Sequence, residues 1–247
     1  MGKVVVNFLG SGDAFGSGGR FQTCIFIESD QTKFLMDCGA SALISMKQFG
    51  VSLLDVASIL ITHLHGDHFG GIPYFVLDSQ LISRRSEPLL IAGPPGLQER
   101  VRSAMEINFP GSSKVAQKFE ITFVELPAGI PTGLGDLKVT PVEVVHGSGA
   151  PSYALRVEVA GKTIVYSGDT EWTDSLIKIV DGADLFICEA YYYEKKMKNH
   201  ISYQTLADHR SDLNCKRIII THMSQDVLNR LDSLEIEYAA DGKVVEL

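Results

Sequence analysis

The sequence predicts a layered α/β protein in which helices cover mixed β-sheets. The first part of the chain is rich in short runs of β-branched and aromatic residues separated by turn residues, which is typical of strands joined by hairpins. The last third alternates helix-like with strand-like segments, which is typical of βα units. No internal repeat, low-complexity stretch or Pro/Ser-rich linker divides the chain, so we expect residues 1–247 to form a single domain.

Hydrophobic runs bounded by turn residues locate the expected elements. In the first two thirds, strands are expected at residues 4–9, 23–28, 33–36, 58–62, 120–124, 137–145, 153–159 and 163–167. Helices are expected there at about residues 69–83 and, more clearly, at 98–107. In the last third, helices are expected at residues 172–180, 202–213 and 225–231, and strands at 184–189, 217–221 and 235–238.

The composition argues against several classes of protein. With 247 residues, 45% of them hydrophobic and 21% charged, the chain has enough apolar material for one large core and does not resemble a disordered protein. Its net charge of −8 disfavours a nucleic-acid partner, because binding a polyanion depends on Lys and Arg contacts with phosphate, although a local basic patch could still bind one. No apolar run approaches the roughly 20 residues of a membrane-spanning helix, so no membrane partner is expected.

The N-terminal segment and the cysteines indicate a cytoplasmic protein. The first residues read as a buried strand and not as a basic segment followed by an apolar run and a cleavage site, so no signal peptide is expected. The four cysteines are far apart and form no Cys-x-x-Cys pair, which favours reduced, buried thiols. They are Cys24, Cys38, Cys188 and Cys215. A homodimer is expected because closed dimers are the commonest oligomers.

One stretch of six residues, HLHGDH, carries the pattern that decides the function. It directly follows a buried strand and contains three of the seven histidines of the chain. In an extended segment the side chains of His63 and His65 point the same way, so both can reach one ion. Gly66 allows a sharp turn, after which Asp67 and His68 face a second position. Imidazole with carboxylate is a ligand set for catalytic Zn, Mn or Fe, whereas a metal-free cluster would repel itself when protonated.

This run resembles the signature of the metallo-β-lactamase superfamily, whose other motifs follow in order along nearly the whole chain. The resemblance implies a four-layer αββα sandwich with a dinuclear metal site. It places a third histidine of the first metal at His146, which follows an expected strand. It also places a bridging aspartate at Asp169, within the sequence SGDT, and the last ligand of the second metal at His222.

The resemblance therefore assigns two divalent metal ions, with Zn expected and Mn or Fe as alternatives. The first ion is assigned to His63, His65, His146 and Asp169. The second ion is assigned to Asp67, His68, Asp169 and His222. Two ions about 3.5–4 Å apart would hold a bridging water and lower its pKa toward neutrality, which makes hydroxide available. Asp67 is also expected to act in catalysis by accepting a hydrogen bond from this nucleophile.

A second pair of residues resembles the phosphodiesterase branch that contains tRNase Z. In that branch a glutamate at a strand end pairs with a histidine about a dozen residues later, and the histidine stabilises or protonates the scissile phosphate. The matching segments here are LFICEA and NHIS. The resemblance implies that Glu189 orients His200 and that His200 acts as general acid or transition-state hydrogen-bond donor. The carboxylate is expected to raise the pKa of His200, and a cationic imidazole suits a phosphoryl transition state. Alternatively, Glu189 caps a strand and His200 lies on a loop.

Other features of the sequence leave two interpretations open. The glycine-rich loop of residues 10–20 misses the dinucleotide-binding spacing by one residue, and similar loops of the tRNase Z branch lie near the active site. Arg20 could contact a phosphate or lie at the surface. Three consecutive tyrosines could line a substrate cleft or pack against the sheet. They are Tyr191, Tyr192 and Tyr193. His209 is expected to be a structural or surface residue of a helix.

The sequence departs from tRNase Z in one respect that bears on the substrate. That family carries a long arm for tRNA between the third histidine and the bridging aspartate. Here only residues 147–168 separate His146 from Asp169, and two expected strands fill them. We therefore predict a metal-dependent phosphodiesterase that uses a metal-bridging hydroxide on a small phosphodiester, such as a cyclic phosphate or nucleotide. The alternatives are a tRNA 3′-processing endoribonuclease, a lactone or thioester hydrolase on the same dinuclear site, and a non-catalytic metal-binding module.

Overall fold

Two seven-stranded sheets form the centre of the structure, a computed structural model that describes residues 2–247. In spatial order the first sheet consists of β14 (Lys243–Glu246), β1 (Val4–Gly10), β2 (Cys24–Ser29), β3 (Lys33–Met36), β4 (Ser58–Leu60), β5 (Leu89–Gly93) and β6 (Ile121–Glu125). The second sheet consists of β13 (Glu237–Tyr238), β12 (Ile218–Thr221), β11 (Leu185–Glu189), β10 (Lys162–Tyr166), β9 (Ser152–Val159), β8 (Leu137–Val144) and β7 (Thr132–Leu134).

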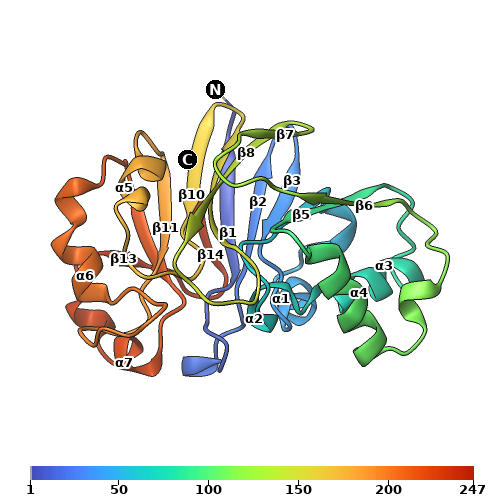
Figure 1. Cartoon of the computed structure of the whole chain (residues 1–247), viewed down its shortest axis with the longest axis horizontal. Coiled ribbons are helices and arrows are strands. Elements are labelled where there is room, and N and C mark those ends of the chain that lie inside the picture. Colours follow the sequence, from blue (N-terminus) through green and yellow to red (C-terminus); the bar gives the residue numbers. More distant parts are fainter. Residues whose placement is uncertain (1) are drawn as a thin grey trace.

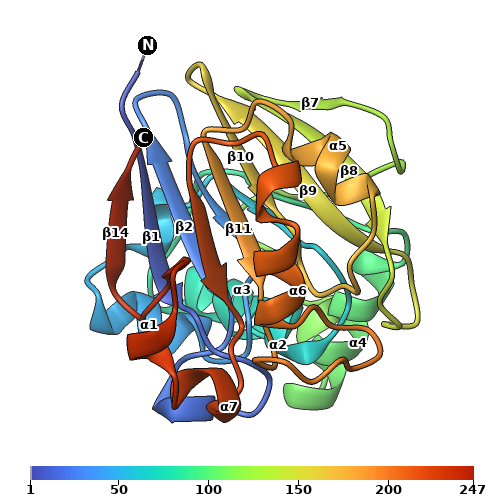
Figure 2. The ribbon, with the colours of Figure 1, turned by 90° about the vertical axis from the view of Figure 1, so that its left-hand side faces the viewer.

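Helices cover the outer face of each sheet. Beside the first sheet lie α1 (Ala42–Gln48), α2 (Gly66–Phe69), α3 (Ile72–Leu81) and α4 (Leu97–Asn108). Beside the second sheet lie α5 (Ser175–Val180), α6 (Tyr203–Asp208) and α7 (Gln225–Leu228). Figures 1 and 2 show the resulting succession of helices, sheet, sheet and helices. The predicted four-layer αββα sandwich is therefore confirmed.

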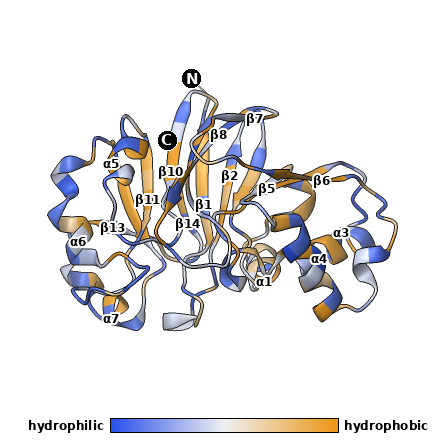
Figure 3. Ribbon diagram, viewed as in Figure 1, coloured by the Kyte–Doolittle hydropathy of each residue, from blue (hydrophilic) through white to orange (hydrophobic). Residues whose placement is uncertain are grey.

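Three hydrophobic cores hold the four layers together. The central core fills the space between the sheets, where Phe8 of the first sheet and Tyr166 of the second are fully buried. The second core lies between the first sheet and α1 to α4, and the third lies between the second sheet and α5 to α7. Strands buried on both faces are apolar along their length, as Figure 3 shows for the central strands. Burial of each large apolar side chain contributes about 1.5–3 kcal/mol.

The strand directions bring several loops to one edge of the sandwich. Strands β3 to β6 run parallel to one another, and so do β10 to β13. Strand β8 runs in the same direction as β10, because both pair antiparallel with β9. The carboxyl ends of parallel strands lie at one edge of a sheet, which is where α/β proteins bind their ligands. Side-chain contacts show that the loops that follow β3, β4, β8, β10, β11 and β12 meet at such an edge.

Most helices are shorter than their sequence patterns predict, whereas α4 extends one residue beyond the expected range of 98–107 at each end. The helix expected at 69–83 is observed as α3, which begins only at Ile72, after Gly71, where a Cβ atom would lie 2.3 Å from the carbonyl oxygen of Gly39. The helix expected at 202–213 ends at Asp208 and is followed by a separate 3₁₀ turn. The short elements α1, β5, β7 and β14 were not predicted. Within residues 2–247, no helix combines the length and the apolar character needed to cross a membrane.

Candidate metal centre

Three imidazoles from two loops form the first cluster at this edge of the sandwich. His63 and His65 follow β4, and His146 follows β8. Their ligand nitrogens all lie within 4.8 Å of one another. The Nε2 atom of His146 lies 3.0 Å from Nδ1 of His65. The structure thus brings together the three histidines that were assigned to the first ion.

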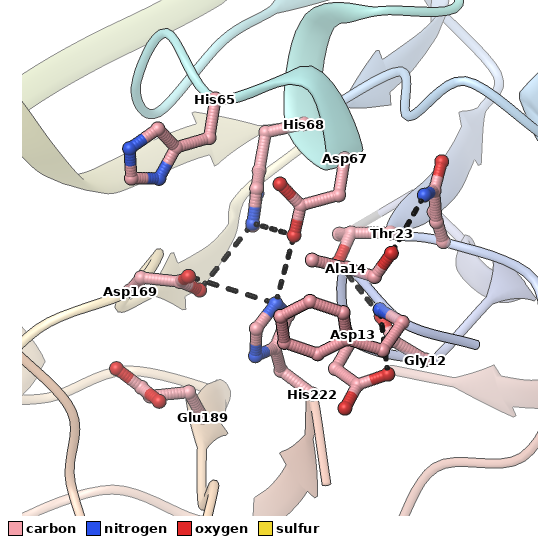
Figure 4. Close-up of polar contacts among 12 residues, drawn as sticks. Gly12, Asp13, Ala14, Thr23, His65, Asp67, His68, Asp169, Glu189 and His222 are labelled. Carbon is pink, nitrogen blue, oxygen red and sulfur yellow. Dashed lines mark hydrogen bonds and ion pairs between the residues drawn. The ribbon is translucent and has the colours of Figure 1, made fainter. Parts of the chain in front are cut away.

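A second cluster lies beside the first and contains Asp67, His68, Asp169 and His222. Figure 4 shows these four side chains pointing toward one another. Oδ2 of Asp67 lies 3.3 Å from Nε2 of His68 and 3.2 Å from Nε2 of His222. Oδ2 of Asp169 lies 3.5 Å from Nε2 of His222 and 3.8 Å from Nε2 of His146. Asp169 therefore lies between the clusters, where the bridging ligand was predicted.

The polar atoms of these clusters fit divalent metal ions. Nε2 of His63, Nε2 of His68 and Oδ1 of Asp169 are buried, and none of them has a hydrogen-bond partner among residues 2–247. Buried polar atoms without a partner are costly unless a further group satisfies them. Nitrogen and oxygen donors facing a shared space are the ligands that divalent transition metals prefer. The seven residues can thus hold divalent metal ions.

The two carboxylates dominate the electrostatics of the second cluster. Burial alone would raise the pKa of Asp169, but the imidazoles of His222 and His68 hold it well below its ordinary value. Burial would lower the pKa of His68, but Asp169, Asp67 and Asp37 raise it. The pKa of His222 is raised for the same reason, mainly by Asp169 against the effect of burial. Without a cation, the protonated imidazoles therefore balance the carboxylates.

This balance makes metal affinity depend on pH. His68 and His222 keep their protons to higher pH than ordinary imidazoles, so a cation has to displace those protons. We expect metal affinity to fall as the pH is lowered from about 8 to about 6, by about tenfold per pH unit for each proton displaced. Competition with a chelator at several pH values measures this change. An affinity that is constant over this range would contradict the prediction.

Two supporting residues that the sequence did not reveal are Asp37 and Thr62. Asp37 follows β3, is fully buried and accepts a hydrogen bond of 2.7 Å from Nδ1 of His68. The hydroxyl of Thr62 donates to Oδ2 of Asp37 at 2.9 Å and lies 3.0 Å from Nδ1 of His63. Such partners orient ligand histidines so that Nε2 faces the metal. The available signal was an aspartate directly after a buried strand.

The second predicted pair, Glu189 and His200, lies next to the clusters. Glu189 ends β11 and is fully buried, and its Oε2 lies 2.9 Å from Nδ1 of His200. The other oxygen, Oε1, accepts a hydrogen bond from the main-chain N–H of Thr170. The ring of His200 lies 5.1 Å from the ring of His146, between centroids. Glu189 therefore orients an imidazole toward the candidate metal centre.

The expectation that Glu189 keeps His200 cationic is wrong. Burial lowers the pKa of His200 although Asp169 attracts a proton. Burial and the nearby Asp169 raise the pKa of Glu189 well above its ordinary value. Both shifts disfavour the charge-separated pair, because a buried site stabilises ions poorly. In the neutral pair, the protonated carboxyl group of Glu189 donates a hydrogen bond to Nδ1 of His200, and the imidazole carries its one proton on Nε2, from which it can donate a hydrogen bond.

The structure separates the interpretations of the three tyrosines. Tyr191 is buried and stacks on the ring of His200, with centroids 4.7 Å apart. Burial, together with Asp13, raises its pKa to about 12, so its phenol is neutral. Tyr192 packs edge-on against Tyr191, whereas Tyr193 stacks on Tyr203 away from the clusters. Tyr191 thus borders the centre, and Tyr193 belongs to the packing of the outer layer.

Arg20 and His209 have structural contacts. The guanidinium of Arg20 donates hydrogen bonds to the carbonyl of Ala239 at 2.6 Å and to Ser11 at 3.1 Å, which ties the glycine-rich loop to the turn before β14. His209 stacks on Trp172 with centroids 4.2 Å apart. This stacking agrees with the structural or surface role expected for His209.

The fold and this cluster define the class of the protein, a metal-dependent hydrolase of the metallo-β-lactamase fold. The structure is similar to that of the metallo-β-lactamase fold protein YhfI from Bacillus subtilis, with a TM-score of 0.79 and 19% identity over 100% of both chains. The chain belongs to the family described as anti-Pycsar protein Apyc1, whose model matches residues 4–243.

Two further relatives support the predicted branch. The chain is 30% identical to the ribonuclease Z of Methanothermobacter thermautotrophicus, over 89% of this chain and 86% of the relative. The structure is also similar to the short form of human tRNase Z, with a TM-score of 0.78, 27% identity and 98% of each chain covered. The predicted superfamily and its tRNase Z-like branch are thus confirmed. Between His146 and Asp169, the chain forms only the β9–β10 hairpin.

Proposed function

We propose that the protein hydrolyses a small phosphodiester, such as a cyclic phosphate or nucleotide, with the help of two divalent metal ions. The observation that carries this proposal is the convergence of two groups of metal-ligand side chains beside the Glu189–His200 pair. The first ion is assigned to His63, His65 and His146, and the second to Asp67, His68 and His222, with Asp169 shared. When bound, such ions supply Lewis acidity and a water of lowered pKa.

The residues of the chain have distinct roles in this proposal. Asp67 lies in the second cluster, where its carboxylate accepts a hydrogen bond from the attacking water and orients it. His200 donates the Nε2 hydrogen bond to the scissile phosphate, and a donor aimed at developing charge stabilises the transition state. Glu189 fixes the orientation of that imidazole through Nδ1 at 2.9 Å. Tyr191 supports the ring of His200 by stacking on it.

The hairpin between His146 and Asp169 supports a small substrate. Its two strands are hydrogen-bonded parts of the second sheet, and no further element in this part of the chain extends outward to hold a folded RNA. The net charge of −8 also favours a small substrate over a folded RNA. The ribonuclease Z relatives favour the second candidate, tRNA 3′ processing. Activity on precursor tRNA therefore has to be compared directly with activity on small phosphodiesters.

Zinc, a cytoplasmic location and a homodimer complete the proposal. Zinc is supported by the ligand set of imidazole and carboxylate. A cytoplasmic location is supported by the four cysteines, which are all free. Metal analysis of the purified protein tests the proposal of zinc, and its mass in solution tests the proposal of a homodimer.

The decisive experiment combines metal loading with a panel of substrates. The protein is stripped with a chelator and reloaded with Zn, Mn or Fe. It is then assayed on bis(p-nitrophenyl) phosphate, a 2′,3′-cyclic nucleotide, precursor tRNA, a lactone and a thioester. We expect metal-dependent turnover of the two small phosphodiesters. Exclusive activity on precursor tRNA would establish the processing enzyme, and exclusive activity on the acyl substrates would establish a carbonyl hydrolase. Inactivity of metal-loaded protein on the whole panel would indicate a binding module.

A further inference from the structure

The short segment that follows β10 connects three parts of the candidate centre. Asp169 lies between the two metal-ligand clusters. Thr170 donates its main-chain N–H to Glu189, and its hydroxyl accepts a hydrogen bond of 3.2 Å from the main-chain N–H of Val145. Glu171 donates its main-chain N–H to the carbonyl of Val145 at 3.0 Å. Val145 immediately precedes His146, so this segment holds the chain on which His146 lies.

The side chain of Glu171 extends this connection to the loop that carries His200. Oε1 of Glu171 accepts a hydrogen bond of 2.8 Å from the main-chain N–H of Asn199. The carbonyl of Asn199 in turn accepts a hydrogen bond of 2.9 Å from Nδ1 of His146. A carbonyl can only accept, so Nδ1 of His146 carries the proton and Nε2 presents its lone pair to the cluster. A carboxylate acceptor makes the bond to Asn199 stronger than a neutral one would.

The backbone of Asn199 takes a conformation that only a few residue types adopt readily. Asn199 has φ of +69°, a left-handed conformation that L-residues other than Gly, Asn and Asp rarely adopt. Asp37 and His222, which also lie at the centre, are left-handed as well, with φ of +57° and +56°. Residues in such conformations persist where surrounding contacts determine them and are concentrated at functional sites. For Asn199, those contacts are Glu171 on its N–H and His146 on its carbonyl.

We propose that Glu171 and Asn199 are positioning residues that set the orientation of His146 for the first metal position. Neither residue belongs to the metal-ligand clusters. Glu171 accepts from the main-chain N–H of Asn199, and the carbonyl of the same residue holds the imidazole in the tautomer that offers Nε2 as a ligand. Because Asn199 directly precedes His200, the same contact places the proposed phosphate donor relative to the first metal. The inference rests on the proposed function only in that it takes His146 as a metal ligand.

The test measures metal binding at the two positions in variants of the full-length protein. Partners behind a metal-ligating histidine change metal affinity by about 10–100-fold when they are removed. We expect Glu171→Ala to weaken one of the two metal-binding steps by about tenfold or more and to leave the other unchanged. Glu171→Gln retains an acceptor oxygen and is expected to restore most of the affinity. The matched control is Glu194→Ala, because Glu194 is exposed on the loop that carries Asn199 and forms no hydrogen bond or ion pair with residues 2–247.

A second pair of variants tests the backbone contact without altering Glu171. Asn199→Gly keeps the left-handed conformation accessible and is expected to bind both metals as the unmodified protein does. Asn199→Ala disfavours that conformation and is expected to reproduce the defect of Glu171→Ala. Thermal unfolding of the metal-free variants tests whether each is folded. If Glu171→Ala does not fold, the comparison of Asn199→Ala with Asn199→Gly still tests the positioning role.

Two outcomes would overturn the inference. In the first, Glu171→Ala binds both metals as tightly as the control does. In the second, Asn199→Ala binds both metals as tightly as Asn199→Gly does. Failure of the proposed function looks different, because the unmodified protein would then bind no metal or would bind it without hydrolysing phosphodiesters.

Discussion

Replacing Asp169 with alanine is expected to abolish phosphodiester hydrolysis and to remove at least one metal ion. The carboxylate lies within 3.9 Å of imidazoles from both clusters and is nearly fully buried, so its removal takes a shared ligand from both proposed metal positions. A metal ion stabilises the transition state by several kcal/mol, which corresponds to a rate loss of about 10³-fold or more. Metal content per chain and the rate on bis(p-nitrophenyl) phosphate measure the two effects.

The matched control for this variant is Asp136→Ala, which removes an exposed aspartate from the turn between β7 and β8. We expect it to retain both metals and full activity. In metal-free protein, Asp169→Ala also removes the carboxylate that raises the pKa values of His68 and His222, so these imidazoles should lose their protons at lower pH. Titration of the histidine resonances detects this shift. An Asp169→Ala protein that binds two metals would refute the bridging role.

Replacing His200 with glutamine is expected to lower kcat by about 10²–10⁴-fold while both metals stay bound. The imidazole lies next to the ring of His146 and is oriented by Glu189, but it is absent from both proposed ligand sets. Its loss removes a hydrogen-bond donor that acts on the transition state. The control is His209→Gln, which changes the same residue type at a position that stacks on Trp172. Metal analysis and steady-state kinetics on each variant separate chemistry from metal binding.

The partner variant Glu189→Gln distinguishes orientation from charge. An amide retains an oxygen for the N–H of Thr170, but it cannot share a proton with His200 in the way that the carboxyl group does. We expect a smaller loss than in His200→Gln, and a double variant with no further loss, because the two residues act as one unit. Loss of metal from His200→Gln in proportion to the loss of rate would contradict the catalytic role of this histidine.

The local sequence was sufficient for the features that depend on neighbouring residues. Alternation of side chains in an extended segment places His63 and His65 on the same side, and Gly66 turns the chain toward Asp67, all within six residues. Most strands were predicted within one or two residues of their observed bounds, because continuous apolar runs between turn residues have few other structures. Resemblance to a known superfamily supplied the distant positions His146, Asp169 and His222.

Only the tertiary structure decided the features that depend on packing between distant segments. The support of His68 by Asp37, and of His146 by Asn199 and Glu171, arises because loops from different strands meet at one edge of the sandwich. The helix expected at 172–180 begins only at Ser175, after Trp172, which stacks on the distant His209. Burial also reversed the expected pKa shift of His200, since the cost of desolvation depends on the whole surroundings of a group and not on its nearest partner.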